Sequence, residues 1–172
     1  MVAISLAKEQ KLSCATLQKL LHYDPITGAF TWLVSRGKVK KGTIAGWVNP
    51  DGYRIISIDD VSYAASRLAW FYMTGKWPVL QVDHENLDKD DNVWANLREA
   101  TNGQNNANKA NYSNNKSGFK GVSWHKSTGL WRAQIRVGGK KVHLCESKDP
   151  QIAYAAYCAA AAQHHQQFAR LV

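Results

Sequence analysis

An asparagine-rich stretch limits what this chain can fold into. Seven of the fourteen residues from 102 to 115 are asparagine, and a segment of this composition cannot bury enough apolar area to lie inside a core. We therefore expect it to begin as a short helix and to continue as an exposed linker, so that the 172 residues form two domains. The predicted boundaries are 1–110 for the first domain, 111–116 for the linker and 117–172 for the second domain.

Charge is distributed unevenly between the two predicted domains. Residues 1–110 carry 13 Lys and Arg against 11 Asp and Glu, whereas residues 111–172 carry 9 against 2. Such a one-sided basic excess favours a polyanionic partner, and it favours nucleic acid over membrane because no amphipathic basic helix or lipidation motif accompanies it. A soluble protein with an ordinary basic surface explains the charge equally well.

Cysteine usage and hydropathy indicate a compartment. The three cysteines, at 14, 145 and 158, are odd in number and far apart, which is typical of a reduced protein without a disulfide framework, and no paired motif predicts a structural zinc. The first residues form too short an apolar run for a signal peptide, and no later run approaches the ~18 residues of a membrane span. We therefore expect a soluble, cytoplasmic protein that does not bind membranes.

The first domain has its own pattern of predicted elements. Apolar spacing and turn signals predict a helix over 13–22, a turn over 24–28, a strand over 30–34, a hairpin of 43–48 with 53–58, and a helix over 63–73. These elements have the character of a scaffold.

In the second domain, residues 130–137 alternate with period two. One predicted face carries Arg132, Gln134 and Arg136, and the other carries Trp131, Ala133, Ile135 and Val137. Gly138-Gly139 predicts a two-residue hairpin turn, and the neighbouring segments predict three antiparallel strands in all. Asp149-Pro150 predicts the start of an alanine-rich helix through residue 162, which covers the apolar face and leaves the polar face bare.

The polar face has the side chains of a strand-based reader of the DNA major groove. Arginine can bridge guanine O6 and N7, and glutamine can pair with adenine. The predicted DNA-binding residues are Arg132, Gln134, Arg136, Ser123, Trp124, Lys126, Lys141 and His143. An ordinary solvated sheet surface is one alternative. Another is an RNA-binding surface on which Trp124 stacks bases, although the usual ribonucleoprotein motif is absent.

A polar stretch of the first domain carries the candidate chemistry. Val82-Asp83-His84 ends an apolar run, Leu97–Ala100 can form a second strand, and Thr101 with Gln104 forms a capping box that predicts a helix from about 102. Asp83 and Asn105 can then supply an oxygen pair to a hard cation such as magnesium. His84 can accept a proton from water near neutral pH. Turn and capping hydrogen bonds are the alternative explanation of these polar residues.

Several motifs of the first domain together resemble the HNH nuclease family in its phage homing-endonuclease form. They are Asp83-His84, Asp91-Asn92, residues 94–101 and 104–106, with the upstream stretches 20–32, 45–46 and 52–56. The resemblance implies an α+β fold with a ββα-metal nuclease domain that has extra strands and helices. It also implies one Mg²⁺ or Mn²⁺ per active site on Asp83 and Asn105, His84 as general base, and Asn96 as the residue that holds the loop and orients that base.

This chain departs from the family pattern at two places. Ser66 stands where a histidine usually precedes the Arg67-Leu-Ala-Trp motif, and Val93 stands where an arginine is common. The departure at Ser66 motivates an alternative, a catalytically impaired, sequence-specific DNA-binding regulator derived from a nuclease.

The second domain resembles the APETALA-type domain of plant ethylene-response factors and of phage and bacterial homing endonucleases. The matching stretches are 117–124, 131–135, the alanine-rich helix and 168–171. The resemblance implies a three-stranded antiparallel sheet packed on one helix, with the sheet in the major groove. Together the two resemblances imply a phage or bacterial enzyme that cleaves double-stranded DNA as a monomer or weak dimer, without a small-molecule organic cofactor.

Overall fold

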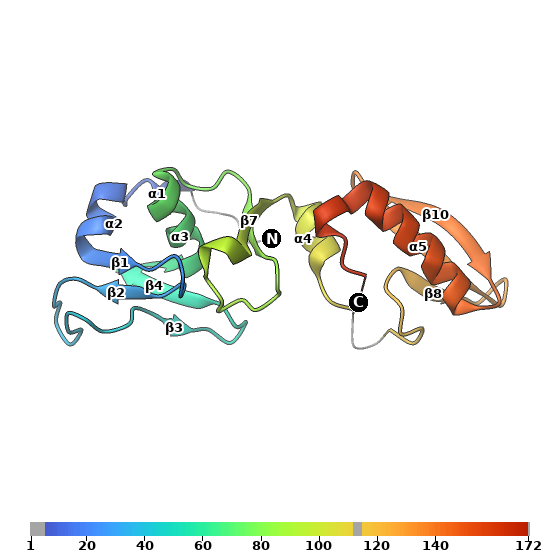
Figure 1. Ribbon diagram of the computed structural model, residues 1–172, viewed down its shortest axis with the longest axis horizontal. Coiled ribbons are helices and arrows are strands. Elements are labelled where there is room, and N and C mark those ends of the chain that lie inside the picture. The colour runs from blue at the N-terminus through green and yellow to red at the C-terminus, as the bar shows by residue number, and fades with distance from the viewer. Residues whose placement is uncertain (1–5, 112–114, 172) are drawn as a thin grey trace. The chain divides into compact units, whose positions relative to one another are not determined.

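The computed structural model describes residues 6–111 and 115–171, and the chain divides into two compact units, Met1–Glu99 and Ala100–Val172. Helices and small antiparallel sheets occur in both units (Figure 1), which confirms the predicted mixture of helix and strand. The functional boundaries predicted at 110 and 116 stay predictions, and part of the predicted linker, residues 112–114, lies outside the described residues. None of the described helices is long and apolar enough to span a membrane.

The first unit contains three small sheets and three helices within its described residues. Its elements are α1 (Leu6–Glu9), α2 (Cys14–Leu20), β1 (Leu21–Tyr23), β2 (Phe30–Trp32), β3 (Trp47–Val48), β4 (Arg54–Ile58), β5 (Val61–Ala64), α3 (Ala65–Thr74), β6 (Gln81–His84), the 3-10 turn η1 (Trp94–Asn96) and β7 (Leu97–Ala100), the last residue of which falls in the second unit. The pairings are β1 with β2, β3 with β4 and β5, and β6 with β7.

Helix α3 supplies the centre of the first core. Its Leu68, Ala69 and Phe71 are buried with Ile56 of β4 and Tyr23 of β1. The helix ends at Gly75, which has a φ of 71° and donates its N–H to Phe71 O over 2.9 Å. Glycine suits this left-handed position because it has no Cβ to clash.

Two helix boundaries predicted from local pattern are wrong. The first predicted helix ends at Leu20 and not at residue 22, because Leu21 and Tyr23 pair with β2 and bury their side chains there. The second begins at Ala65 and not at Tyr63, because residues 61–64 form β5 and pair with β4. In both cases strand pairing extends a sheet at the expense of a helix end that propensity alone would favour.

The second unit has one sheet with a long helix against it. Its elements are α4 (Asn102–Asn108), β8 (Val122–His125), β9 (Leu130–Val137), β10 (Lys140–Ser147), α5 (Pro150–His165) and the 3-10 turn η2 (Gln166–Phe168). The antiparallel order is β10-β9-β8, and α5 runs along one face of this sheet (Figure 1). Asp149 caps α5 by accepting the Gln151 N–H, as predicted, although the helix continues to His165, beyond the predicted end at 162.

Small residues allow α5 to lie close to the sheet. Ala153, Tyr157 and Ala161 are buried against Val122, Ala133 and Ile135. Gly121 has a φ of 74°, and a Cβ there would meet the Tyr157 ring at 2.1 Å. The apolar face predicted for residues 130–137 is therefore the face that the helix covers.

Candidate active site and nucleic-acid interface

Asp83 and His84 lie side by side at the end of β6. They are 4% and 5% exposed, although both belong to a polar stretch of sequence. A buried carboxylate and a buried imidazole are costly unless they are paired, so their partners define the site.

Asn96 holds the two ends of the loop that follows β6. Its side-chain oxygen accepts the Asn86 N–H over 3.0 Å, and its amide group donates to Asp91 O over 2.8 Å. The backbone continues the same connection, because the Glu85 N–H donates to Asn96 O over 3.0 Å. These contacts are those of a loop-holding residue, and the further role predicted for Asn96, orienting the base, stays a prediction.

The hydrogen-bond partner of His84 in this loop is Asn92, a residue to which the sequence assigned no function. His84 Nε2 and Asn92 Oδ1 are 3.3 Å apart, and Asn92 Nδ2 donates to Asp90 O over 2.9 Å. Because Nδ2 is the donor of that amide, Oδ1 accepts, and Nε2 must carry the imidazole proton. The basic lone pair of the neutral ring is then on Nδ1.

Burial lowers the pKa of His84 below its ordinary value, while the hydrogen bond to Asn92 and the charge of Asp83 act in the opposite direction. The lowered pKa favours the neutral imidazole near neutral pH, which is the form that accepts a proton.

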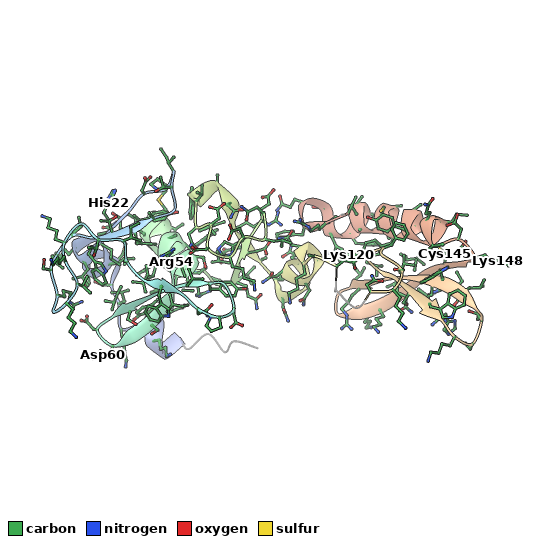
Figure 2. The ribbon with its side chains drawn as sticks, turned by 90° about the horizontal axis from the view of Figure 1, so that it is seen from below. His22, Arg54, Asp60, Lys120, Cys145 and Lys148 are labelled. Atoms are coloured by element: carbon green, nitrogen blue, oxygen red, sulfur yellow. The ribbon has the colours of Figure 1, made fainter. Side chains whose placement is uncertain are left out.

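Residues from the rest of the first unit fix the loop around Asn92. The Tyr23 hydroxyl donates to Asn92 O over 2.7 Å, and Gly28 lies so close that a Cβ there would meet Asn92 C at 2.4 Å. Arg54, labelled in Figure 2, forms two hydrogen bonds of 2.8 Å with the Asp90 carboxylate. The loop is therefore attached to β1, to the turn after it and to β4.

Asp83 is paired with a cation of the next strand. Arg98 Nε lies 3.0 Å from Asp83 Oδ2, and Arg98 Nη1 lies 3.4 Å from Glu85 Oε2. Carboxylate and amide oxygens are ligands that suit magnesium or manganese, and the proposed donors Asp83 and Asn105 have this chemistry. Within residues 6–111 and 115–171, no group of three or more His, Cys, Asp and Glu side chains could hold a metal ion, so any cation here depends on few protein ligands.

Asn105, the second proposed ligand, lies in α4 of the second unit. The predicted capping box is confirmed, because Thr101 Oγ1 accepts the Gln104 N–H and Gln104 Oε1 accepts the Thr101 N–H. The convergence of Asn105 with Asp83 stays a prediction.

Ser66 is buried in the first turn of α3, at 5% exposure. Its neighbour Arg67 bonds to Glu9 over 2.7 Å and to the carbonyl oxygens of Pro78 and Leu80 over 2.9 and 3.0 Å. Arg67 thereby fixes the segment that leads into β6.

The strand register of the second unit places most of the predicted DNA-binding residues on one face. Directly opposite pairs are Ser123 with Arg132, Arg132 with Glu146, Gln134 with His143 and Arg136 with Lys141. Opposite residues on neighbouring strands share a face, so six of the eight predicted residues are brought together. A β-bulge between His143 and Cys145 keeps Glu146 in this row.

Glu146 and His125 are two members of this surface that the sequence did not indicate. Arg132 Nε donates to Glu146 Oε1 over 2.7 Å, and His125 Nδ1 lies 2.9 Å from the same oxygen. The hydrogen bond from Arg132 lowers the pKa of Glu146, so Glu146 is ionised at neutral pH. The sequence did not predict that Glu146 lies opposite Arg132, because the β-bulge shifts the strand pairing by one residue.

Two predicted DNA-binding residues lie elsewhere. Trp124 pairs with Trp131, its ring 5.1 Å away, and strand alternation places both on the face opposite Arg132. Trp124 is nevertheless 49% exposed. Lys126 lies in the exposed turn that follows β8.

Comparison with known proteins bears on the first of these sites. The HNH endonuclease family model matches residues 63–107, a span that includes Asp83, His84, Asn96 and Asn105. The match supports an HNH nuclease, a hydrolase that acts on nucleic acid. The match does not extend to the sheet of the second unit, and the APETALA-type domain there stays a prediction. Neither the curated proteins nor the solved structures gave a significant match.

Proposed function

We propose that the protein is a divalent-metal-dependent DNA endonuclease that hydrolyses phosphodiester bonds. The observation that carries the proposal is that Asp83 and His84 lie buried side by side. Asn92 accepts a hydrogen bond from His84 Nε2 over 3.3 Å. This contact assigns the imidazole proton to Nε2, so the basic nitrogen is Nδ1, and burial lowers the pKa of the imidazole and favours its neutral form.

His84 acts as the general base. It takes a proton from water as the water oxygen forms a bond to phosphorus, and the P–O3′ bond then breaks, so that the 3′ oxygen leaves and is protonated by solvent. Asn92 holds the imidazole in one tautomer and orientation throughout, and Asn96 keeps the loop closed around it.

Asp83 and Asn105 would hold the cation. When bound, a Mg²⁺ or Mn²⁺ ion supplies positive charge that stabilises the pentavalent phosphate and the departing oxygen. Arg98 Nε, 3.0 Å from Asp83 Oδ2, fixes the direction of the carboxylate.

The sheet of the second unit positions the enzyme on double-stranded DNA. Arg136 and Lys141 are exposed on its uncovered face and contact phosphates, while Arg132 and Gln134 read base edges. This assignment rests on the register that aligns these residues and on the basic charge of the C-terminal third of the chain.

Incubation of supercoiled plasmid with the protein in Mg²⁺, Mn²⁺ or EDTA tests the proposal. We expect metal-dependent cleavage by the wild type, loss of cleavage with retained DNA binding in His84→Ala, and wild-type activity in the matched control His22→Ala, an exposed histidine of the same unit. Because each chain has one such site, nicked circles should appear before linear plasmid. A wild type that binds DNA but leaves it intact in both metals would refute the nuclease.

The second candidate function is that of a catalytically impaired, sequence-specific DNA-binding regulator. The buried Ser66, which stands where the HNH family pattern implies a histidine, favours it. Under this alternative the wild type binds duplex DNA and fails to cleave, whereas Ser66→His gains metal-dependent nicking.

A further inference from the structure

Helix α4, which carries Asn105, has its own small core within the second unit. Ala107 of α4, Ala100 before it and Phe168 of η2 form a separate buried cluster, and they are 7%, 0% and 4% exposed. Phe168 comes from the end of the chain, more than sixty residues after Ala107. The C-terminal segment therefore forms part of the support of α4.

A lysine side chain also binds the C-terminal end of α4. The ammonium group of Lys120, labelled in Figure 2, donates to the carbonyl oxygens of Ala107 and Lys109, the latter over 2.6 Å. These are among the last carbonyls of α4, which have no partner inside the helix. Burial, with a smaller effect of Arg170, lowers the pKa of Lys120 to about 8.

Helix α4 needs this support because it is short. It has seven residues, of which four are asparagine, whereas isolated helices below roughly 12 residues are marginal in water. The capping box fixes its first turn, and Phe168 and Lys120 hold its last turn. We expect removal of either contact to release the helix that carries Asn105.

We propose that Phe168 and Lys120 are positioning residues for Asn105, the proposed metal ligand on α4. The inference rests on the proposed function, because its consequence is a change in metal-dependent cleavage. Substitutions of Phe168 or Lys120 should reduce cleavage even where DNA affinity is unchanged.

The test uses the full-length chain with Phe168→Ala and Phe168→Leu, and with Ile152→Ala as a matched apolar truncation on the exposed side of α5, where Ile152 is 60% exposed. Three quantities are measured: amide hydrogen exchange of residues 102–108, the affinity for Mn²⁺ by electron paramagnetic resonance, and the dissociation constant for duplex DNA. For Phe168→Ala we expect exchange in α4 and the Kd for Mn²⁺ each to rise by at least about tenfold. DNA affinity should stay within about twofold, and Phe168→Leu should restore most of the Mn²⁺ affinity.

A second variant separates positioning from general loss of folding. Lys120→Met keeps the side-chain stem and removes the donor, and Lys116→Met removes the same charge from an exposed position of the same unit. Weaker Mn²⁺ binding in Lys120→Met alone supports the inference. Unchanged exchange in α4, or unchanged Mn²⁺ affinity in both Phe168→Ala and Lys120→Met, overturns it. If the wild type binds Mn²⁺ but does not cleave DNA, the proposed nuclease function is refuted. Hydrogen exchange in α4 and the affinity for Mn²⁺ then still decide whether Phe168 and Lys120 position Asn105.

Discussion

Replacing Asn92 by aspartate tests whether this residue sets the protonation of His84. The substitution preserves shape but places a carboxylate where the amide oxygen now lies 3.3 Å from His84 Nε2. Burial holds the pKa of His84 below its ordinary value in the wild type, so the acidic limb of the cleavage profile should lie below that of an ordinary histidine. A new negative charge at this distance stabilises the imidazolium and raises its pKa.

The size of the effect follows from the position of the new charge. A charge of opposite sign within a hydrogen bond of a titrating group shifts its pKa by roughly 1–3 units. The acidic limb of Asn92→Asp should therefore move up by about 1–3 pH units, and at a pH below both limbs activity should fall roughly ten- to a thousandfold. The lost donation to Asp90 O destabilises the first unit by about 1–3 kcal/mol.

Nicking rates of wild type, Asn92→Asp and Asn92→Ala are compared from pH 5 to pH 9 at saturating Mn²⁺. Asn92→Ala serves as the control, because it removes the hydrogen bond and adds no charge, so its acidic limb should not move upward. Thermal unfolding and DNA affinity establish that each variant is folded. An Asn92→Asp profile that overlies the wild-type profile would show that Asn92 does not act on the general base.

Three further predictions concern charged pairs. Arg98→Met removes the guanidinium from the buried Asp83 carboxylate, which should lower the free energy of unfolding by about 3–5 kcal/mol in urea denaturation. Millimolar Mg²⁺ should restore part of this loss. Equal stability of the wild type and Arg98→Met would contradict the prediction. Glu146→Gln removes the charge that competes for Arg132, so DNA should bind more tightly and with a steeper salt dependence in fluorescence anisotropy. An unchanged Kd would count against the sheet as the DNA face. The pKa of Lys120 is about 8 in the folded chain, whereas the unfolded chain keeps that proton up to about pH 10.4. The free energy of unfolding should therefore rise between pH 8 and pH 10 in the wild type relative to Lys120→Met, and parallel curves for the two would disprove this.

Local signals in the sequence predicted the elements that are fixed locally. The capping box of Thr101 and Gln104, the cap at Asp149 and the two-residue turn after Val137 are confirmed, because each depends on neighbours in the sequence. The helix ends at Leu20 and Ala65 were mispredicted, since distant strands decide them. Apolar spacing is the same whether such residues face a helix or a sheet partner.

In the candidate site, too, the sequence predicted residues with local signals and missed roles that depend on distant contacts. Asp83 and His84 could be found from their position at the end of an apolar run, and both are buried there. Asn92 belongs to one of the matching motifs, but its role could not be predicted, because its contacts to Tyr23 and Gly28 join segments more than sixty residues apart. Glu146 was missed for a related reason, since only the bulge in β10 brings it opposite Arg132.

In the proposed DNA complex, the contact between Arg132 and Glu146 would determine how the sheet discriminates between DNA sequences. Arg136 and Lys141 are exposed and can meet phosphates at little cost. Arg132 must first give up a charge-assisted bond of 2.7 Å, a loss that only a geometry as good as the paired acceptors of guanine can offset. A phosphate met at random does not offer that geometry in the right place. If the sheet binds DNA as proposed, Glu146 should reduce nonspecific affinity more than specific affinity, and Arg132 should contribute more to sequence preference than its charge alone would suggest.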